Sequence, residues 1–229
     1  MCIGSLNGSV GATAMRQIAK VLVLATMTVA MFWSSVAEAF FFGLPRTLKH
    51  QVAQIGFDSP MLPPIGHTRF CLRYPTDCKV QGIDFRRRNI ALTVERWIEL
   101  NLVNRQVNRD IIPEITPGNG VTEEWLIAPP AGDCKDYAIT KRHELLARGW
   151  PSRSLLLSEV VVSSGEHHLV LVVRTKDVDL VLDNLNANIR SVATVDRVYQ
   201  WVRIETPQNP KFWAQVRMPS TMRTAMISD

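Results

Sequence analysis

Apolar and polar positions follow two different periods along the chain. Within residues 89–108 the apolar side chains recur every three or four positions, which predicts an amphipathic helix. A second helix is predicted over residues 134–148, because Gly149 and Pro151 follow it as stop signals. Residues 40–85 are rich in proline and hold only short apolar pieces, so we expect loops there with one or two short helices.

Beyond the second helix the pattern changes to that of strands. Strands are predicted over residues 155–162, 168–175 and 179–183, and residues 199–205 and 212–217 could add two more. The loops between the first three have hairpin-like lengths, so we expect antiparallel pairing. Helices first and strands later, without βαβ alternation, indicate an α+β fold with one antiparallel sheet.

The N-terminus has the features of a secretory signal. Two basic residues precede the uncharged apolar run 21–33, and Ala37-Glu38-Ala39 follows it as a cleavage-type end. An uncleaved membrane anchor is the alternative, but the run is shorter than the roughly 20 residues that a spanning helix needs. We therefore expect a signal peptide at residues 1–39 and a single domain at residues 40–229. The mature protein is expected to be periplasmic or otherwise exported, with no stable membrane span.

Composition and charge exclude several classes of protein. The chain is 46% hydrophobic and 21% charged, which is typical of a globular protein and not of a disordered one. The formal net charge is +5, and the only dense basic run is Arg86-Arg87-Arg88, directly before the first helix pattern. A solvated helix start explains this run better than a nucleic-acid site, which would need a basic stripe with aromatic residues. We expect no nucleic-acid partner.

The expected export changes how the four cysteines are interpreted. Cys2 would leave with the signal peptide, and Cys71 and Cys78 flank a short loop that contains Pro75. An oxidising compartment favours a Cys71–Cys78 disulfide. Cys134 is then unpaired, and such a thiol is buried and inert, intermolecular, or reactive.

The surroundings of Cys134 favour the reactive alternative. Cys134 lies in the first turn of its predicted helix, where the partial positive charge of the helix N-terminus favours a thiolate. His168 begins one predicted strand and Asp183 ends the next. In an antiparallel pair these two positions are neighbours, and the helix could present Cys134 to both. A nucleophile, a base and a group that orients the base could thus meet at one place.

The local sequence motifs around these three residues identify a protein family more specifically than their spacing does. They resemble those of the bacterial transglutaminase-like cysteine peptidases, the family of the LapG-like periplasmic proteases. The resemblance extends over about residues 60–205 and rests on Gly132-Asp133-Cys134-Lys135-Asp136-Tyr137-Ala138, His168-Leu169-Val170-Leu171 and Val181-Leu182-Asp183-Asn184, and also on Val103-Asn104-x-x-Val107-Asn108 and Glu124-Trp125. It implies a papain/transglutaminase-like fold in which the helix that bears the nucleophile packs on an antiparallel β-sheet. It also implies that Cys134 is the nucleophile, His168 the general base and acid, and Asp183 the orienting acid.

The function implied by the resemblance is that of an exported cysteine peptidase. It would hydrolyse peptide bonds of protein or peptide substrates, among which a cell-surface protein is a candidate, through a thioester acyl-enzyme. Transfer of the same acyl group to an amine, as in a transglutaminase, is one alternative. A non-catalytic binding protein on the same scaffold is another, although the intact triad argues against it.

Calcium is the one cofactor that the resemblance raises. The family binds calcium through acidic residues on both sides of the nucleophile. Here Asp133 precedes Cys134, but Lys135 follows it, and a cation beside a calcium site opposes binding. We therefore expect no required cofactor, with Asp133 as a weak calcium candidate, and Lys135 could instead support a thiolate.

Several neighbouring residues have structural interpretations. Strand alternation should turn His167 to the face opposite His168, and His143 should be solvated on the polar side of its helix. A zinc site formed by Cys134 and these histidines would lack any standard ligand spacing.

Two residues close to the predicted site could have either role. Asp136 is interpreted as a helix-start carboxylate rather than a site residue. Trp125 is expected either in the core or, by analogy with transglutaminase-type enzymes, lining the site near the oxyanion. The backbone N–H of Cys134 is the more certain oxyanion donor.

Overall fold

The computed structural model describes residues 54–82, 89–114 and 124–218. The predicted signal peptide, the domain boundary at residue 40 and the arginine run 86–88 lie outside these residues. No helix within the described ranges combines the length and the apolar composition needed to cross a membrane.

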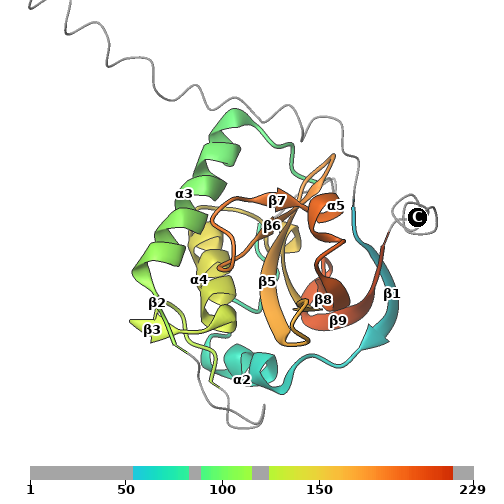
Figure 1. Ribbon diagram of the computed structural model, residues 1–229, viewed down its shortest axis with the longest axis horizontal. Coiled ribbons are helices and arrows are strands. Elements are labelled where there is room, and N and C mark those ends of the chain that lie inside the picture. Colours follow the sequence, from blue (N-terminus) through green and yellow to red (C-terminus); the bar gives the residue numbers. More distant parts are fainter. Residues whose placement is uncertain (1–53, 83–88, 115–123, 219–229) are drawn as a thin grey trace, which may run out of the picture. The chain divides into compact units, whose positions relative to one another are not determined.

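An antiparallel sheet of seven strands forms the centre of the fold (Figure 1). The strand order is β1-β9-β8-β4-β5-β6-β7, so the hairpins β4–β5, β5–β6 and β8–β9 pair neighbours in the sequence. The strands are β1 (Gly56–Met61), β4 (Leu155–Val161), β5 (His167–Arg174), β6 (Asp179–Leu182), β7 (Arg190–Ser191), β8 (Gln200–Thr206) and β9 (Asn209–Arg217). A separate parallel pair is formed by β2 (Ile112–Pro113) and β3 (Ala131–Gly132).

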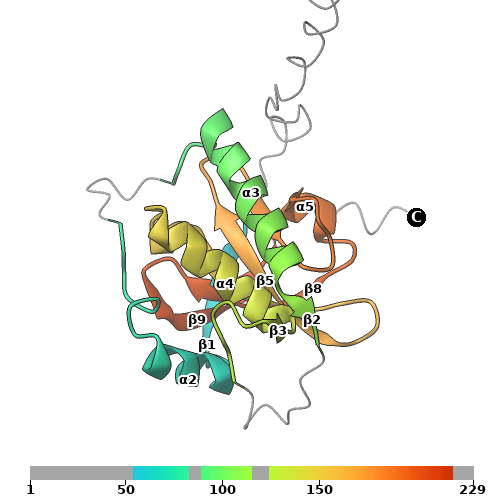
Figure 2. The same cartoon turned by 90° about the vertical axis from the view of Figure 1, so that its left-hand side faces the viewer.

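Two long helices, α3 (Val94–Asp110) and α4 (Cys134–Ala147), lie over one face of the sheet (Figure 2). Short helices complete the fold: α2 (Ile65–Arg73), the 3₁₀ turn η2 (Ser152–Ser154) and α5 (Val192–Val195). Alternate residues of β4, β5 and β6 enter two separate cores. Leu169 and Leu171 pack with α3 and α4, whereas Val170 and Val172 pack with α5 on the other face. Burial on both faces explains why these strands read as continuous apolar runs.

The predicted α+β fold with one antiparallel sheet is confirmed. The helix predicted over 134–148 and all five predicted strands are present, and no end differs from the prediction by more than three residues. The first long helix begins at Val94 rather than at residue 89. The Thr93 hydroxyl caps it by accepting the Arg96 N–H at 3.3 Å, while Ile90 instead bridges to Thr175.

The predicted disulfide between Cys71 and Cys78 is present, and Cys134 is the free cysteine of the described chain. The disulfide joins the end of α2 to the loop that follows it. Within the region expected to hold only loops and short helices, α2 is present, but β1 was not predicted.

Candidate active site

Cys134 is the first residue of α4, and a capping box holds this turn. The Asp133 side chain accepts the Lys135 backbone N–H at 3.2 Å, and the Asp136 side chain accepts the Asp133 backbone N–H at 3.1 Å. These bonds satisfy two N–H groups that a helix start leaves open. Cys134 itself is partly exposed, so its thiol is fixed on a rigid helix end and remains accessible.

His168 and Asp183 are brought together by the β5–β6 hairpin. Leu171 of β5 pairs with Leu182 of β6, which places the start of one strand beside the end of the other. The Nε2 of His168 lies 2.8 Å from Oδ1 of Asp183, and both side chains are buried. Cys134 borders the same cleft as His168, and its thiol is one of the groups that raise the pKa of that imidazole. The three residues expected at one site therefore do meet there.

Further groups that the sequence analysis did not identify surround Asp183. The Tyr199 hydroxyl donates a hydrogen bond to Oδ2, and the Leu185 backbone N–H donates to Oδ1 at 3.0 Å. Arg190 lies 3.6 Å from Oδ2 and also donates to the Tyr199 hydroxyl at 3.1 Å. Nothing in the local sequence around Tyr199 or Arg190 signals these contacts, since they depend on how α5 returns the chain to the sheet.

Two asparagines on α3 hold the loop that begins with Asp183. The side chain of Asn108 donates to the Asp183 carbonyl at 2.9 Å, and that of Asn104 donates to the Ala187 carbonyl at 3.0 Å. The two residues are four positions apart, so they lie on one face of the helix. This geometry gives a physical role to the asparagines of the Val-Asn-x-x-Val-Asn motif.

The charges of His168 and Asp183 are set by the groups that contact them. Burial lowers the pKa of His168, but the hydrogen bonds with Asp183 and Cys134 outweigh it and raise this pKa from 6.5 to about 9. Burial acts to raise the pKa of Asp183, but His168 and Tyr199 bring it below its ordinary value. Burial and the Asp183 carboxylate raise the pKa of Tyr199, so this phenol stays a donor. At neutral pH the site therefore holds an imidazolium against a carboxylate.

Lys141 is an unexpected buried amine on the same helix as Cys134. Its Nζ has no hydrogen-bond partner among the described residues and lies 5.9 Å from the centre of the Tyr137 ring. Burial lowers the pKa of Lys141 to about 7, although the nearby Asp183 charge raises it. The Lys141 amine therefore binds its proton only weakly at neutral pH, and when it is protonated it adds a positive charge near Asp183.

A cleft of about 500 Å³ opens beside Cys134 and His168. One wall is apolar and proline-rich and comes from residues 62–65, of which the Leu62 side chain is largely exposed. Polar residues also line the cleft, namely Glu159, His167 and Arg203, and Arg203 donates a hydrogen bond to the Leu62 carbonyl at 2.7 Å. An extended polypeptide could lie in this cleft with a carbonyl group beside the thiol.

His167 lies closer to the candidate site than its expected position on the opposite face of the sheet suggested. His167 does lie on the sheet face opposite His168, but it borders the same cleft because both residues stand at the open end of β5. Its Nδ1 lies 2.5 Å from Oε1 of Glu159, which in turn bonds to Arg203. His167 is therefore not remote from the site.

Trp125 belongs both to the core and to the cleft wall. Its exposure is only 5%, yet its ring borders the cleft together with Gly66 and Cys134. A Cβ at Gly66 would stand 2.2 Å from the indole Nε1, so only glycine permits this approach. Asp136 fixes the segment after Trp125 by accepting the Leu126 N–H at 2.9 Å, which supports the structural interpretation of that carboxylate.

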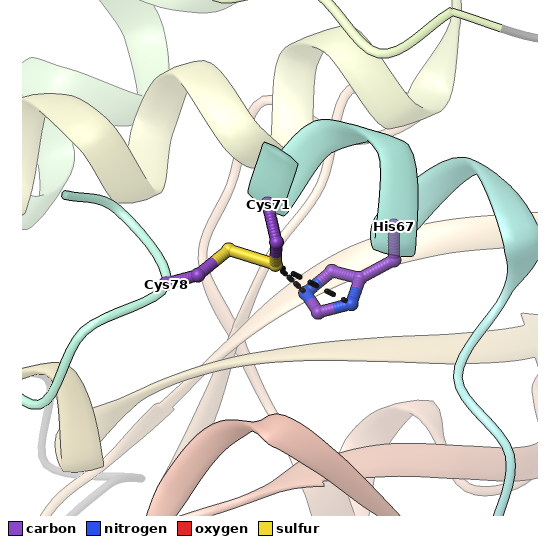
Figure 3. A group of neighbouring side chains, drawn as sticks. All are labelled: His67, Cys71 and Cys78. Carbon is purple, nitrogen blue, oxygen red and sulfur yellow. Dashed lines mark hydrogen bonds between the residues drawn. A yellow bond between two sulfur atoms is a disulfide. The ribbon is translucent and has the colours of Figure 1, made fainter. Parts of the chain in front are cut away.

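Metal-binding groups are found away from Cys134. His143 does not join Cys134; its Nδ1 lies 2.8 Å from Oδ1 of Asp77, and its side chain is half-exposed rather than fully solvated. Among the described residues, the ligand atoms of His67, Cys71 and Cys78 lie within 4.8 Å of one another (Figure 3). The two sulfurs are joined as a disulfide, and His67 Nε2 lies 2.9 Å from Oε1 of Glu205. This group therefore offers no thiolate ligands while the disulfide is intact.

Comparison with protein families matches residues 58–221 to the family described as bacterial transglutaminase-like cysteine proteinase, BTLCP. Comparison with curated proteins gives no significant match. Among solved structures, Legionella pneumophila LapG aligns with 26% identity over 52% of this chain and 68% of that chain, with a TM-score of 0.43. A calcium-bound structure of the same protein aligns with 22% identity over 57% and 80% of the two chains, with a TM-score of 0.45.

Proposed function

Because the chain belongs to the bacterial transglutaminase-like cysteine proteinases, it is a cysteine protease, and we propose that it hydrolyses polypeptides with Cys134, His168 and Asp183 as its triad. The observation that carries the proposal is the position of His168, which bonds to Asp183 and borders the same cleft as Cys134. A nucleophile on a helix N-terminus, a base and a buried orienting carboxylate together form the arrangement of a thiol hydrolase.

The reaction follows from this geometry. The Cys134 sulfur attacks the carbonyl carbon of the bound peptide, and the backbone N–H of Cys134 would stabilise the oxyanion that forms. His168, held as imidazolium by Asp183, gives its proton to the departing amine as the C–N bond breaks, leaving a thioester on Cys134. A water molecule then attacks the thioester carbon and gives one proton to His168. The acid product leaves, and the thiolate–imidazolium pair is restored.

The compartment is part of the same proposal. The Cys71–Cys78 disulfide and the signal-like residues 1–39 support secretion into an oxidising compartment such as the periplasm. The cleft is open enough for an extended segment of a protein substrate, and a cell-surface protein would be accessible there. Intact-mass measurement of the protein from its native host tests this point, with cleavage after Ala39 as the expected result.

The test of the triad is the rate at which iodoacetamide labels Cys134 at different pH values, followed by peptide mapping. Wild-type protein should label rapidly at neutral pH, because an imidazolium beside the sulfur favours the reactive thiolate. Exchange of His168 for alanine should slow labelling at neutral pH by roughly tenfold or more, since the thiolate loses its counter-charge. Exchange of His143 for glutamine is the matched control. Coincident profiles for wild type and His168→Ala would overturn the assignment.

Hydrolysis is tested separately with fluorescently labelled casein in the presence of a fluorescent primary amine. Release of labelled peptides that is abolished in Cys134→Ala and reduced by orders of magnitude in Asp183→Asn supports the protease reaction. Incorporation of the amine into casein without peptide release would instead mean acyl transfer.

A further inference from the structure

The ammonium group of Lys135 is buried at the turn that presents the nucleophile. Lys135 is only 2% exposed, although lysine side chains are almost never buried without a counter-charge. Its Nζ bonds to Oδ2 of Asp133, and the same Nζ lies 3.7 Å from Oδ2 of Asp136. One ammonium group therefore faces the two carboxylates that flank Cys134 in the sequence.

The two carboxylates need a positive charge at this place. Both belong to the capping box of α4, which holds them close together at the helix start. Burial raises the pKa of Asp136, and the Lys135 charge acts in the opposite direction. Without a cation the two groups would repel each other, and the turn that carries the Cys134 N–H would lose part of its support.

These residues do not fit a calcium ion. Calcium takes six to eight oxygen ligands at about 2.3–2.6 Å. The space that Oδ2 of Asp133 and Oδ2 of Asp136 share already faces an ammonium group, whose charge would repel a divalent ion. The two oxygens of Asp136 also accept the backbone N–H groups of Leu126 and Asp133. With Lys135 in place, Asp133 and Asp136 are thus used in protein contacts and are not arranged as a metal cradle.

We propose that Lys135 is a built-in cation that takes the place of a metal ion at the nucleophile turn, so that this protease needs no calcium. The ammonium group neutralises Asp133 and Asp136 and keeps the first turn of α4 in position. Lys135 is a positioning residue, since its Nζ is engaged by the carboxylates of Asp133 and Asp136. The consequence for catalysis rests on the proposed function, whereas the consequence for stability does not.

The first experiment compares the wild-type protein in excess EGTA and in millimolar calcium. The melting temperature and the rate of Cys134 alkylation by iodoacetamide should be the same in both. A saturable rise of the melting temperature with calcium, or slower alkylation in EGTA, would overturn the proposal. Because melting does not require turnover, this result is independent of whether the triad assignment is correct.

The second experiment replaces the cation. In EGTA, Lys135→Glu should melt roughly 5–10 °C lower than wild type, as expected when one partner of a buried ion pair is lost from a domain of this size. Calcium should restore part of that loss, because three carboxylates then face one another. Lys211→Glu makes the same charge change at an exposed position of β9 and should show neither effect. A Lys135→Glu protein that melts like the Lys211→Glu control, or that calcium does not stabilise, would contradict the proposal.

Discussion

At the scale of single residues, the site depends on groups that keep Asp183 ionised. A buried carboxylate is costly unless donors surround it, and Asp183 has His168, Tyr199 and the Leu185 N–H around its two oxygens. These donors lower the pKa of Asp183, and the ionised carboxylate in turn raises that of His168. The bond of Nε2 to Asp183 fixes the orientation of the His168 ring.

The titration of His168 is the first prediction. Its pKa is raised from 6.5 to about 9, so its contribution to stability is complete below pH 6.5 and is lost as the pH rises through about 9. Protonation of the leaving amine should fail over the same range, so hydrolysis should decline above about pH 9. Side-chain NMR, with His168 assigned from the spectrum of His168→Gln, measures the midpoint directly. In Asp183→Asn the midpoint should move down, and a wild-type midpoint close to 6.5 would refute the imidazolium assignment.

At the scale of elements, the sequence was sufficient where one local pattern dominated. The strands β4, β5 and β6 are long apolar runs, and α4 has a cap at Asp133 and a glycine after its last turn, so their positions could be predicted. β1 could not, because the exposed Asp58, Ser59 and Pro60 interrupt its short apolar pattern and it pairs only with β9, far along the chain. The same limit applies to the site, since Tyr199 and Arg190 reach Asp183 only through tertiary packing.

The contact between α3 and the loop after β6 gives the second prediction. Asn108 holds the Asp183 backbone across 75 positions of sequence, so Asn108→Ala should allow Asp183 and with it His168 to shift. We expect Cys134 alkylation at neutral pH to slow by roughly tenfold, because small displacements of catalytic groups have large effects on rate. Loss of the hydrogen bond should lower the free energy of unfolding by about 1 kcal/mol.

Asn101→Ala is the matched control for this prediction. Asn101 lies on the same helix, but its side chain bonds to the Trp97 carbonyl of that helix at 2.8 Å. Loss of this hydrogen bond should lower the free energy of unfolding and leave the rate of Cys134 alkylation unchanged. Equal alkylation rates in the two variants would mean that α3 does not position Asp183.

At the scale of the whole molecule, the cleft is formed by parts that are far apart in the sequence. Cys134 lies on α4 and His168 on β5, while the apolar wall comes from the segment before α2 and from α2 itself. Most of the described chain is held by the two cores on either face of the sheet. The loop after α2 reaches one of these cores through Cys78, and the disulfide links this residue to Cys71 in α2.

The disulfide therefore gives the last prediction. Replacing Cys71 and Cys78 with alanine together should lower the free energy of unfolding by roughly 2 kcal/mol, because the open loop gains freedom in the unfolded chain. For a domain of this size that corresponds to a fall of roughly 4–8 °C in melting temperature. Dithiothreitol should produce a similar fall in the wild-type protein and none in the double variant, which separates loss of the bond from loss of packing at the buried Cys78. If the reductant left wild-type melting unchanged while reducing the bond, the disulfide would not stabilise the wall of the cleft. Cys134 should keep its alkylation rate in the double variant, since Cys134 begins α4 whereas the contact of this helix with the loop, from His143 to Asp77, lies near its other end.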